Sequence, residues 1–121
     1  TANKTALICE SVNFARDLIN GNADDVTPQY LAAVAKGLEK TCEHVTTTVF
    51  DKKRIEKEKM GLLLAVNRGS CHDPAFIIVD YKGNPQSKDH TVIIGKGITF
   101  DTGGLLIKPR GGMETMKDDM S

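Results

Sequence analysis

The segment that follows Ile94 contains glycine at a density found nowhere else in the chain. Six of the 11 glycines fall within the eighteen residues from Gly95 to Gly112. Because glycine has no side chain, such a segment lets the backbone approach a bound ligand closely, and binding and catalytic residues concentrate in loops. The regular hydrophobic patterns of the chain end where this segment begins, so we expect any chemistry to lie within it.

Three helices and a strand are predicted in the first half of the chain. Hydrophobic residues recur at intervals of three and four from about residue 4 to residue 20, which predicts an amphipathic helix. Thr27 followed by Pro28 is typical of a helix N-cap and first turn, and predicts a second helix. The β-branched run Val45–Phe50 predicts a strand. Asp51 can then cap a short charged helix that ends near Gly61.

Three further apolar runs predict the rest of a sheet. They lie at residues 62–66, 76–81 and 91–94, and segments rich in turn-forming residues separate them. Short apolar runs bounded in this way are typical of neighbouring strands. Helices first, then strands with one intervening helix, predict an α/β fold in which helices flank a mixed sheet.

The composition excludes several classes of protein. A chain of 121 residues accommodates one hydrophobic core and hardly two, so we expect a single domain over residues 1–121. Sixteen basic and sixteen acidic residues give a formal net charge of zero, which disfavours nucleic acid as a partner. No run is apolar and long enough to span a membrane. Three cysteines without a CxxC spacing favour a reducing, cytoplasmic compartment.

Two lysines and two aspartates are distributed over the last part of the chain. Lys96 follows the last apolar run, Asp101 and Lys108 flank a pair of glycines, and Asp119 lies among the final residues. Carboxylate oxygens brought together at the end of a strand suit a divalent cation, and one carboxylate can bridge two ions. Lysine is protonated in water, so each lysine is either the ion-pair partner of an aspartate or, beside a dication, a neutral nitrogen ligand. The spacing leaves both interpretations open.

The stretch GKGITFDTGGLLIKPRGGMETMKDDMS, at residues 95–121, resembles the metal-binding signature of the leucine aminopeptidase, or cytosol aminopeptidase, family. Members share the pattern VGKGxTFDxGGxxxKPxxxMxxMKxDM. Upstream, ARDLINGNADDVTPQYLA resembles the family's RDLxNxPxNxxTPxxLA segment, and LLLAVNRGSCHDPAFIIVDYKG resembles its strand-loop-strand before the signature. The resemblance covers nearly the whole chain and implies the front portion of a zinc-exopeptidase-like catalytic domain.

The resemblance also implies a role for individual residues. Lys96 and Asp119 would bind one zinc ion, and Asp101 would bridge two, with manganese as the alternative metal. Lys108 would be the catalytic electrophile, a protonated amine that polarises the substrate carbonyl. Met116 falls where the family lines the pocket for the substrate's first side chain. Plain packing on the face of a helix that starts near the end of the chain is the other interpretation of Met116.

The implied activity is the removal of apolar N-terminal residues from a peptide substrate by a metal-activated water. Family members are hexamers, so a homo-oligomer is expected. The family completes its site with a later NTDAEGR motif, whose aspartate, glutamate and arginine are not in this sequence. We therefore expect residues 1–121 to be a partial catalytic domain without activity of its own. The alternative is a non-catalytic metal-binding or scaffold module that retains the fold.

Overall fold

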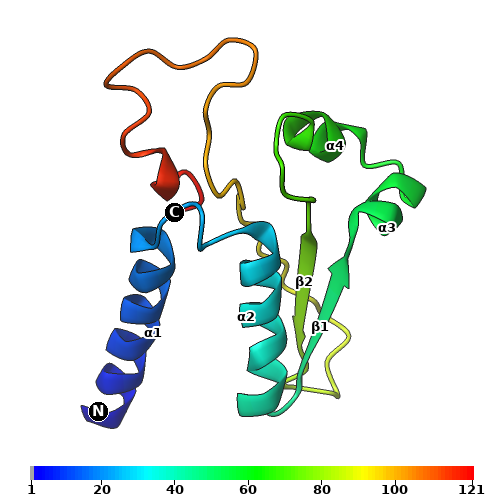
Figure 1. Ribbon diagram of the computed structural model, residues 1–121. Coiled ribbons are helices and arrows are strands. Elements are labelled where there is room, and N and C mark those ends of the chain that lie inside the picture. Colours follow the sequence, from blue (N-terminus) through cyan, green and yellow to red (C-terminus); the bar gives the residue numbers. More distant parts are fainter. Residues whose placement is uncertain (1) are drawn as a thin grey trace. The chain divides into compact units, whose positions relative to one another are not determined.

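The computed structural model describes residues 2–121. In chain order, its elements are α1 (Ala2–Asn20), α2 (Pro28–Thr41), β1 (Val45–Phe50), α3 (Lys52–Lys57), α4 (Gly61–Asn67), β2 (Phe76–Tyr81) and the 3₁₀ helix η1 (Met116–Asp118) (Figure 1). The chain forms two compact units. The first unit combines the residues up to Val26 with Gly95–Ser121, and the second unit is Thr27–Ile94. Over residues 2–121, no helix has the length and apolar character that crossing a membrane requires.

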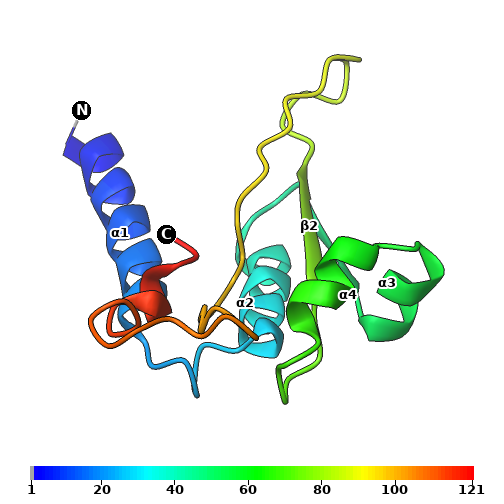
Figure 2. The same cartoon turned by 90° about the horizontal axis from the view of Figure 1, so that it is seen from above.

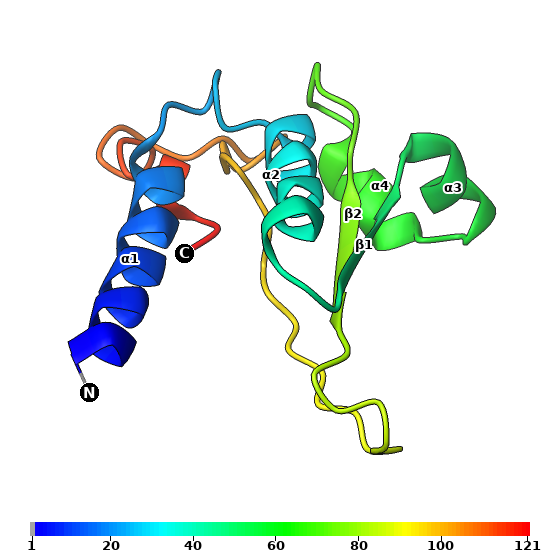
Figure 3. The same ribbon diagram turned by 90° about the horizontal axis from the view of Figure 1, so that it is seen from below.

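The second unit is a pair of strands flanked by helices. β1 and β2 are antiparallel, in a register that runs from Val45 opposite Tyr81 to Phe50 opposite Phe76. Helix α2 lies on one side of the strands, and α3 and α4 lie on the other (Figure 3). The predicted α/β class, with helices flanking a sheet, is confirmed, but the two strands are antiparallel where a mixed sheet was predicted. In the part of the chain that the structure describes, the sheet consists of these two strands.

The predicted caps begin helices α2 and α3. Thr27 Oγ1 accepts a hydrogen bond from the backbone N–H of Tyr30 at 3.2 Å, and Asp51 Oδ1 accepts one from that of Arg54 at 2.8 Å. These bonds satisfy amides that the start of a helix leaves unpaired. Helix α3 ends at Lys57, earlier than predicted, and it buries Ile55 completely.

Two of the predicted strands are wrong. Residues 62–66 belong to helix α4. A short apolar run cannot be assigned to helix or strand by periodicity alone, and the leucines and alanine of this run are strong helix formers. Residues 91–94 belong to no helix or strand. Val92, Ile93 and Ile94 are between 77% and 92% exposed, because no strand among the described residues pairs with them.

The first unit consists of α1, the turn that follows it up to Val26, and the long irregular segment from Gly95 that contains η1 (Figure 2). The predicted helix over residues 4–20 is confirmed. Within α1 only Leu18 and Ile19 are half-buried, whereas Leu7 is 64% exposed. The helix stops at Gly21, whose N–H donates to the carbonyl oxygen of Asp17 at 3.1 Å. The C-terminal turn of α1 is therefore the part of the helix that packs.

Candidate metal centre

The structure brings the four predicted charged residues together in two pairs within the first unit. Lys96 Nζ lies 2.7 Å from Asp119 Oδ1, and Lys108 Nζ lies 3.0 Å from Asp101 Oδ2. The segment that carries them is coloured orange to red in Figure 1. Both lysines therefore act as ion-pair partners of aspartates in this structure.

Asp101 is held as an anion by several groups. Its Oδ1 accepts a hydrogen bond from the Gly103 N–H at 2.8 Å. This bond is the main reason that the pKa of the Asp101 carboxyl lies below its ordinary value, followed by the hydrogen bond from Lys108, while the charges of Lys108 and Lys96 act in the same direction. The positive charge of Lys96 thus acts on Asp101 as well as on its direct partner.

Asp119 has a carboxylate oxygen without a partner. Its side chain is only 14% exposed, and its Oδ2 is buried with no hydrogen-bond donor. A buried carboxylate oxygen ordinarily has a donor or a cation beside it. This unpaired oxygen, together with the carboxylate of Asp101, fits the hard oxygen donors that a divalent cation prefers. Residues 2–121 contain no cluster of three or more His, Cys, Asp or Glu side chains suited to a metal.

A closed loop delivers Lys108 to Asp101. The backbone N–H of Lys108 donates to the carbonyl oxygen of Thr102 at 2.9 Å. Gly103 has a φ of +89°, and a Cβ atom added there would lie 2.3 Å from the carbonyl oxygen of Leu106. Only glycine fits this position, because any side chain would open the loop.

Met116 contacts the predicted catalytic amine. Its Sδ lies 2.8 Å from Lys108 Nζ. Met116 begins η1, so the helix expected at the end of the chain is a single 3₁₀ turn. Of the two adjacent aspartates in this turn, Asp119 pairs with Lys96.

Glu114 is a structural residue that sequence reasoning missed. Its Oε1 accepts a hydrogen bond from the N–H of Gly111 at 2.9 Å, and its Oε2 accepts one from Met113 at 3.2 Å. Its own backbone N–H, followed by those of Gly111 and Met113, holds the pKa of the Glu114 carboxyl below its ordinary value. An acidic residue just after a Gly-Gly turn was the available signal, because such side chains often bond to nearby amides.

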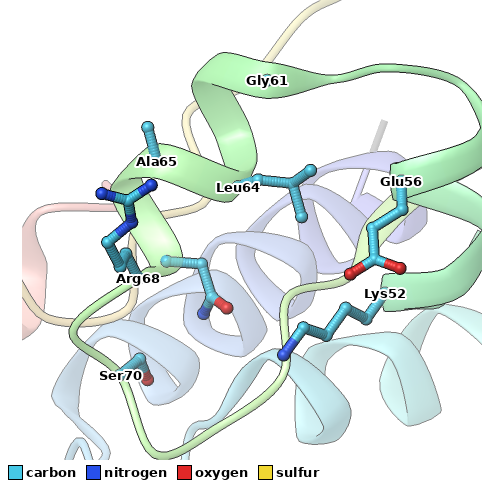
Figure 4. Close-up of a pocket in the computed structure, with 8 residues that line it drawn as sticks. Lys52, Glu56, Gly61, Leu64, Ala65, Arg68 and Ser70 are labelled. Atoms are coloured by element: carbon cyan, nitrogen blue, oxygen red, sulfur yellow. The ribbon is translucent and has the colours of Figure 1, made fainter.

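The second unit has a hollow of about 440 Å³ beside α3 and α4, lined by side chains that include Lys52, Glu56 and Leu64 (Figure 4). It contains none of the predicted site residues. Lys52 pairs with Asp73 at 3.3 Å, and both side chains are substantially exposed. The candidate centre is assigned to the first unit, which contains all four charged residues.

The chain matches a known protein family over most of its length. The profile described as "Cytosol aminopeptidase family, catalytic domain" matches residues 13–121. The chain belongs to the cytosol aminopeptidase family. The matched region includes the glycine-rich segment and all four charged residues of the candidate centre.

Relatives of this cytosol aminopeptidase family member include curated proteins and a solved structure. The probable cytosol aminopeptidase of Protochlamydia amoebophila is 69% identical over 99% of this chain, and that of Chlamydia felis is 58% identical over 98%. The chain spans about a quarter of the length of these relatives, 24% of each. The structure of the bottromycin maturation enzyme BotP in complex with Mn matches 88% of this chain and 22% of its own, with a TM-score of 0.75 and 36% identity.

Proposed function

We propose that this chain contributes part of the two-metal site of a cytoplasmic aminopeptidase, which hydrolyses the N-terminal residue from a peptide. The observation that carries the proposal is that one unit holds the ion pairs Lys96–Asp119 and Lys108–Asp101, with a buried oxygen of Asp119 unpaired. Membership in a peptidase family supports the reaction class.

Lys96, Asp101 and Asp119 would hold the metal ions, and Asp101 would be shared between two. When bound, the ions would supply Lewis acidity to the scissile carbonyl and lower the pKa of water toward neutrality. Zinc is our first choice, and manganese is the alternative because BotP is described in complex with Mn. For Lys96 to become a ligand it must release its proton, so the carboxylate of Asp119 would exchange an ammonium partner for a dication.

Lys108 would keep its proton and stabilise negative charge on the substrate oxygen. Its Nζ lies 3.0 Å from Asp101 Oδ2. The side chain is 28% exposed, so Nζ can exchange a contact with Asp101 for one with a substrate carbonyl. A fixed positive charge at that oxygen is worth more in the transition state than in the ground state, because the charge on the oxygen develops there.

Met116 would border the pocket for the first side chain of the substrate. Its contact with Lys108 Nζ supports this proposal over packing alone, since a residue that touches the catalytic amine lies beside the reacting carbonyl. An apolar thioether there favours apolar N-terminal residues such as leucine.

These 121 residues should not turn over substrate by themselves. Two ions require more acidic ligands than Asp101 and Asp119 supply, so further carboxylates must complete the site. We propose that the complete enzyme is a homo-oligomer, a hexamer as in the family.

The test is the kinetics of Lys108→Ala in the longest natural polypeptide that carries this segment. With leucyl-p-nitroanilide, we expect kcat to fall by roughly 10²–10³-fold while KM changes little, because one stabilising donor is lost in the transition state. Lys88→Ala, which removes an exposed lysine of the second unit, is the matched control. A rise in KM at constant kcat would assign Lys108 to substrate binding. A metal-loaded wild type without hydrolysis would favour the non-catalytic module.

A further inference from the structure

The last turn of α1 lies against η1, although the two elements are at opposite ends of the chain. Lys117 Nζ donates a hydrogen bond to the carbonyl oxygen of Asn20 at 2.9 Å, across 97 residues of sequence. In each of the three views, η1 lies beside the C-terminal end of α1 (Figures 1, 2 and 3). This contact joins the ARDLING stretch at residues 15–21, which the proposed reaction does not use, to the turn that carries Asp119.

The end of α1 is suited to receive a cation. The last carbonyl groups of a helix have no partner within the helix, and they form the negative end of its dipole. A lysine that donates to such a carbonyl satisfies one of them and interacts favourably with the dipole. Leu18 and Ile19, the half-buried residues of α1, lie in this same turn.

Gly21 and Val26 pack closely at the C-terminal end of α1, where η1 makes its contact. A Cβ atom added to Gly21 would lie 2.4 Å from Val26 Cγ2, and Val26 is only 5% exposed. The N–H of Val26 donates to the carbonyl oxygen of Asn22 at 2.8 Å, which folds the chain back at the helix end. The surface under η1 is therefore a closed turn and not a frayed helix terminus.

The hydrogen bond of Lys117 also restrains the residues on either side of it in the turn. Lys117 stands between Met116, which contacts Lys108, and Asp119, which contacts Lys96. The N–H of Asp118 donates to the carbonyl oxygen of Thr115 at 2.9 Å, and this bond closes the turn that holds the three residues.

We infer that the C-terminal end of α1 holds η1 in place, and that Lys117 is the positioning residue which sets the location of Asp119. The effect on metal binding rests on the proposed function. The docking itself rests only on the contact between Lys117 and Asn20.

The experiment compares Lys117→Ala and Lys117→Arg in the longest natural polypeptide that contains residues 1–121. Zn²⁺ and Mn²⁺ are each titrated calorimetrically into metal-free protein, and amide hydrogen exchange is measured at residues 115–119. We expect Lys117→Ala to weaken metal affinity by about tenfold, the lower end of the effect of groups that position metal ligands, and to speed exchange in η1. Lys117→Arg should restore both, because a guanidinium can donate to the same carbonyl.

Lys4→Ala, which removes an exposed lysine from the first turn of the same helix, is the control and should change neither measurement. Unchanged exchange at residues 115–119 in Lys117→Ala would overturn the docking. Metal affinity lowered equally by Ala and Arg would overturn the positioning role. If the wild type binds neither metal, the proposed function fails, while hydrogen exchange still decides whether α1 anchors η1.

Discussion

Replacing Gly103 by alanine should disturb the site far more than the same replacement at Gly104. Both glycines have positive φ, +89° and +71°, so a side chain at either position carries a backbone strain of about 1–3 kcal/mol. At position 104 nothing lies within 4 Å of the added Cβ atom. At position 103 the Cβ atom would lie 2.3 Å from Leu106 O and 3.0 Å from Lys108 N.

The size of the displacement follows from these distances. An unstrained contact of a Cβ atom begins at 3.4 Å, against 2.3 Å at Gly103, so the backbone near Leu106 must move by about 1 Å. The groups in the way are backbone atoms of the loop that carries Lys108, and they cannot rotate aside. A misplacement of about 1 Å in a catalytic group can reduce the rate by about 10²-fold.

The assay is the hydrolysis of leucyl-p-nitroanilide by metal-loaded natural polypeptide, with thermal unfolding measured in parallel. We expect Gly103→Ala to lower kcat by about 10²-fold, and Gly104→Ala to lower stability by about 1–3 kcal/mol with kcat nearly unchanged. Equal losses of kcat in the two variants would refute the role of loop closure in placing Lys108.

Two further predictions concern stability and titration. Because Ile55 is completely buried, Ile55→Ala should lower the free energy of unfolding by about 2–5 kcal/mol in urea denaturation, whereas Leu62→Ala, at a site 88% exposed, should change it by less than about 0.5 kcal/mol. The carboxyl of Glu114 should titrate below its ordinary value of 4.5 in NMR. Because its folded pKa is lowered, its contribution to stability is present above the unfolded pKa and is lost as pH falls through the folded pKa. Glu114→Gln should remove that part of the acid dependence. An unshifted titration would contradict the hydrogen bonds from Gly111 and Met113 to this carboxylate.

Local signals in the sequence were sufficient to predict the helices that are defined by capping residues and hydrophobic periodicity. Thr27 with Pro28, and Asp51 before a charged run, predict where α2 and α3 begin because the cap side chains bond to amides within three residues. The run at residues 62–66 could not be assigned in this way, since its leucines suit a helix or a buried strand. Residues 91–94 can form a strand only if a second strand pairs with them, and a local sequence pattern does not reveal whether such a strand is present.

The same distinction applies to the candidate site. The charged residues of the glycine-rich segment could be selected from their types and spacing, and the family resemblance assigned roles to them. The unpaired oxygen of Asp119 and the contact of Lys117 with Asn20 could not be predicted, because they depend on how distant segments pack. The closure of the loop around Gly103 was also not predictable, since glycine density alone does not tell which glycine lies against backbone.

Calorimetric titration of Zn²⁺ and Mn²⁺ into the metal-free natural polypeptide tests the central proposal most directly, with Asp101→Ala compared against Asp118→Ala. If Asp101 is shared by two ions, its loss should weaken binding by at least about tenfold and reduce the number of ions bound, while Asp118→Ala should behave as the wild type. The same affinity and the same number of ions in Asp101→Ala would contradict a metal site built on this carboxylate.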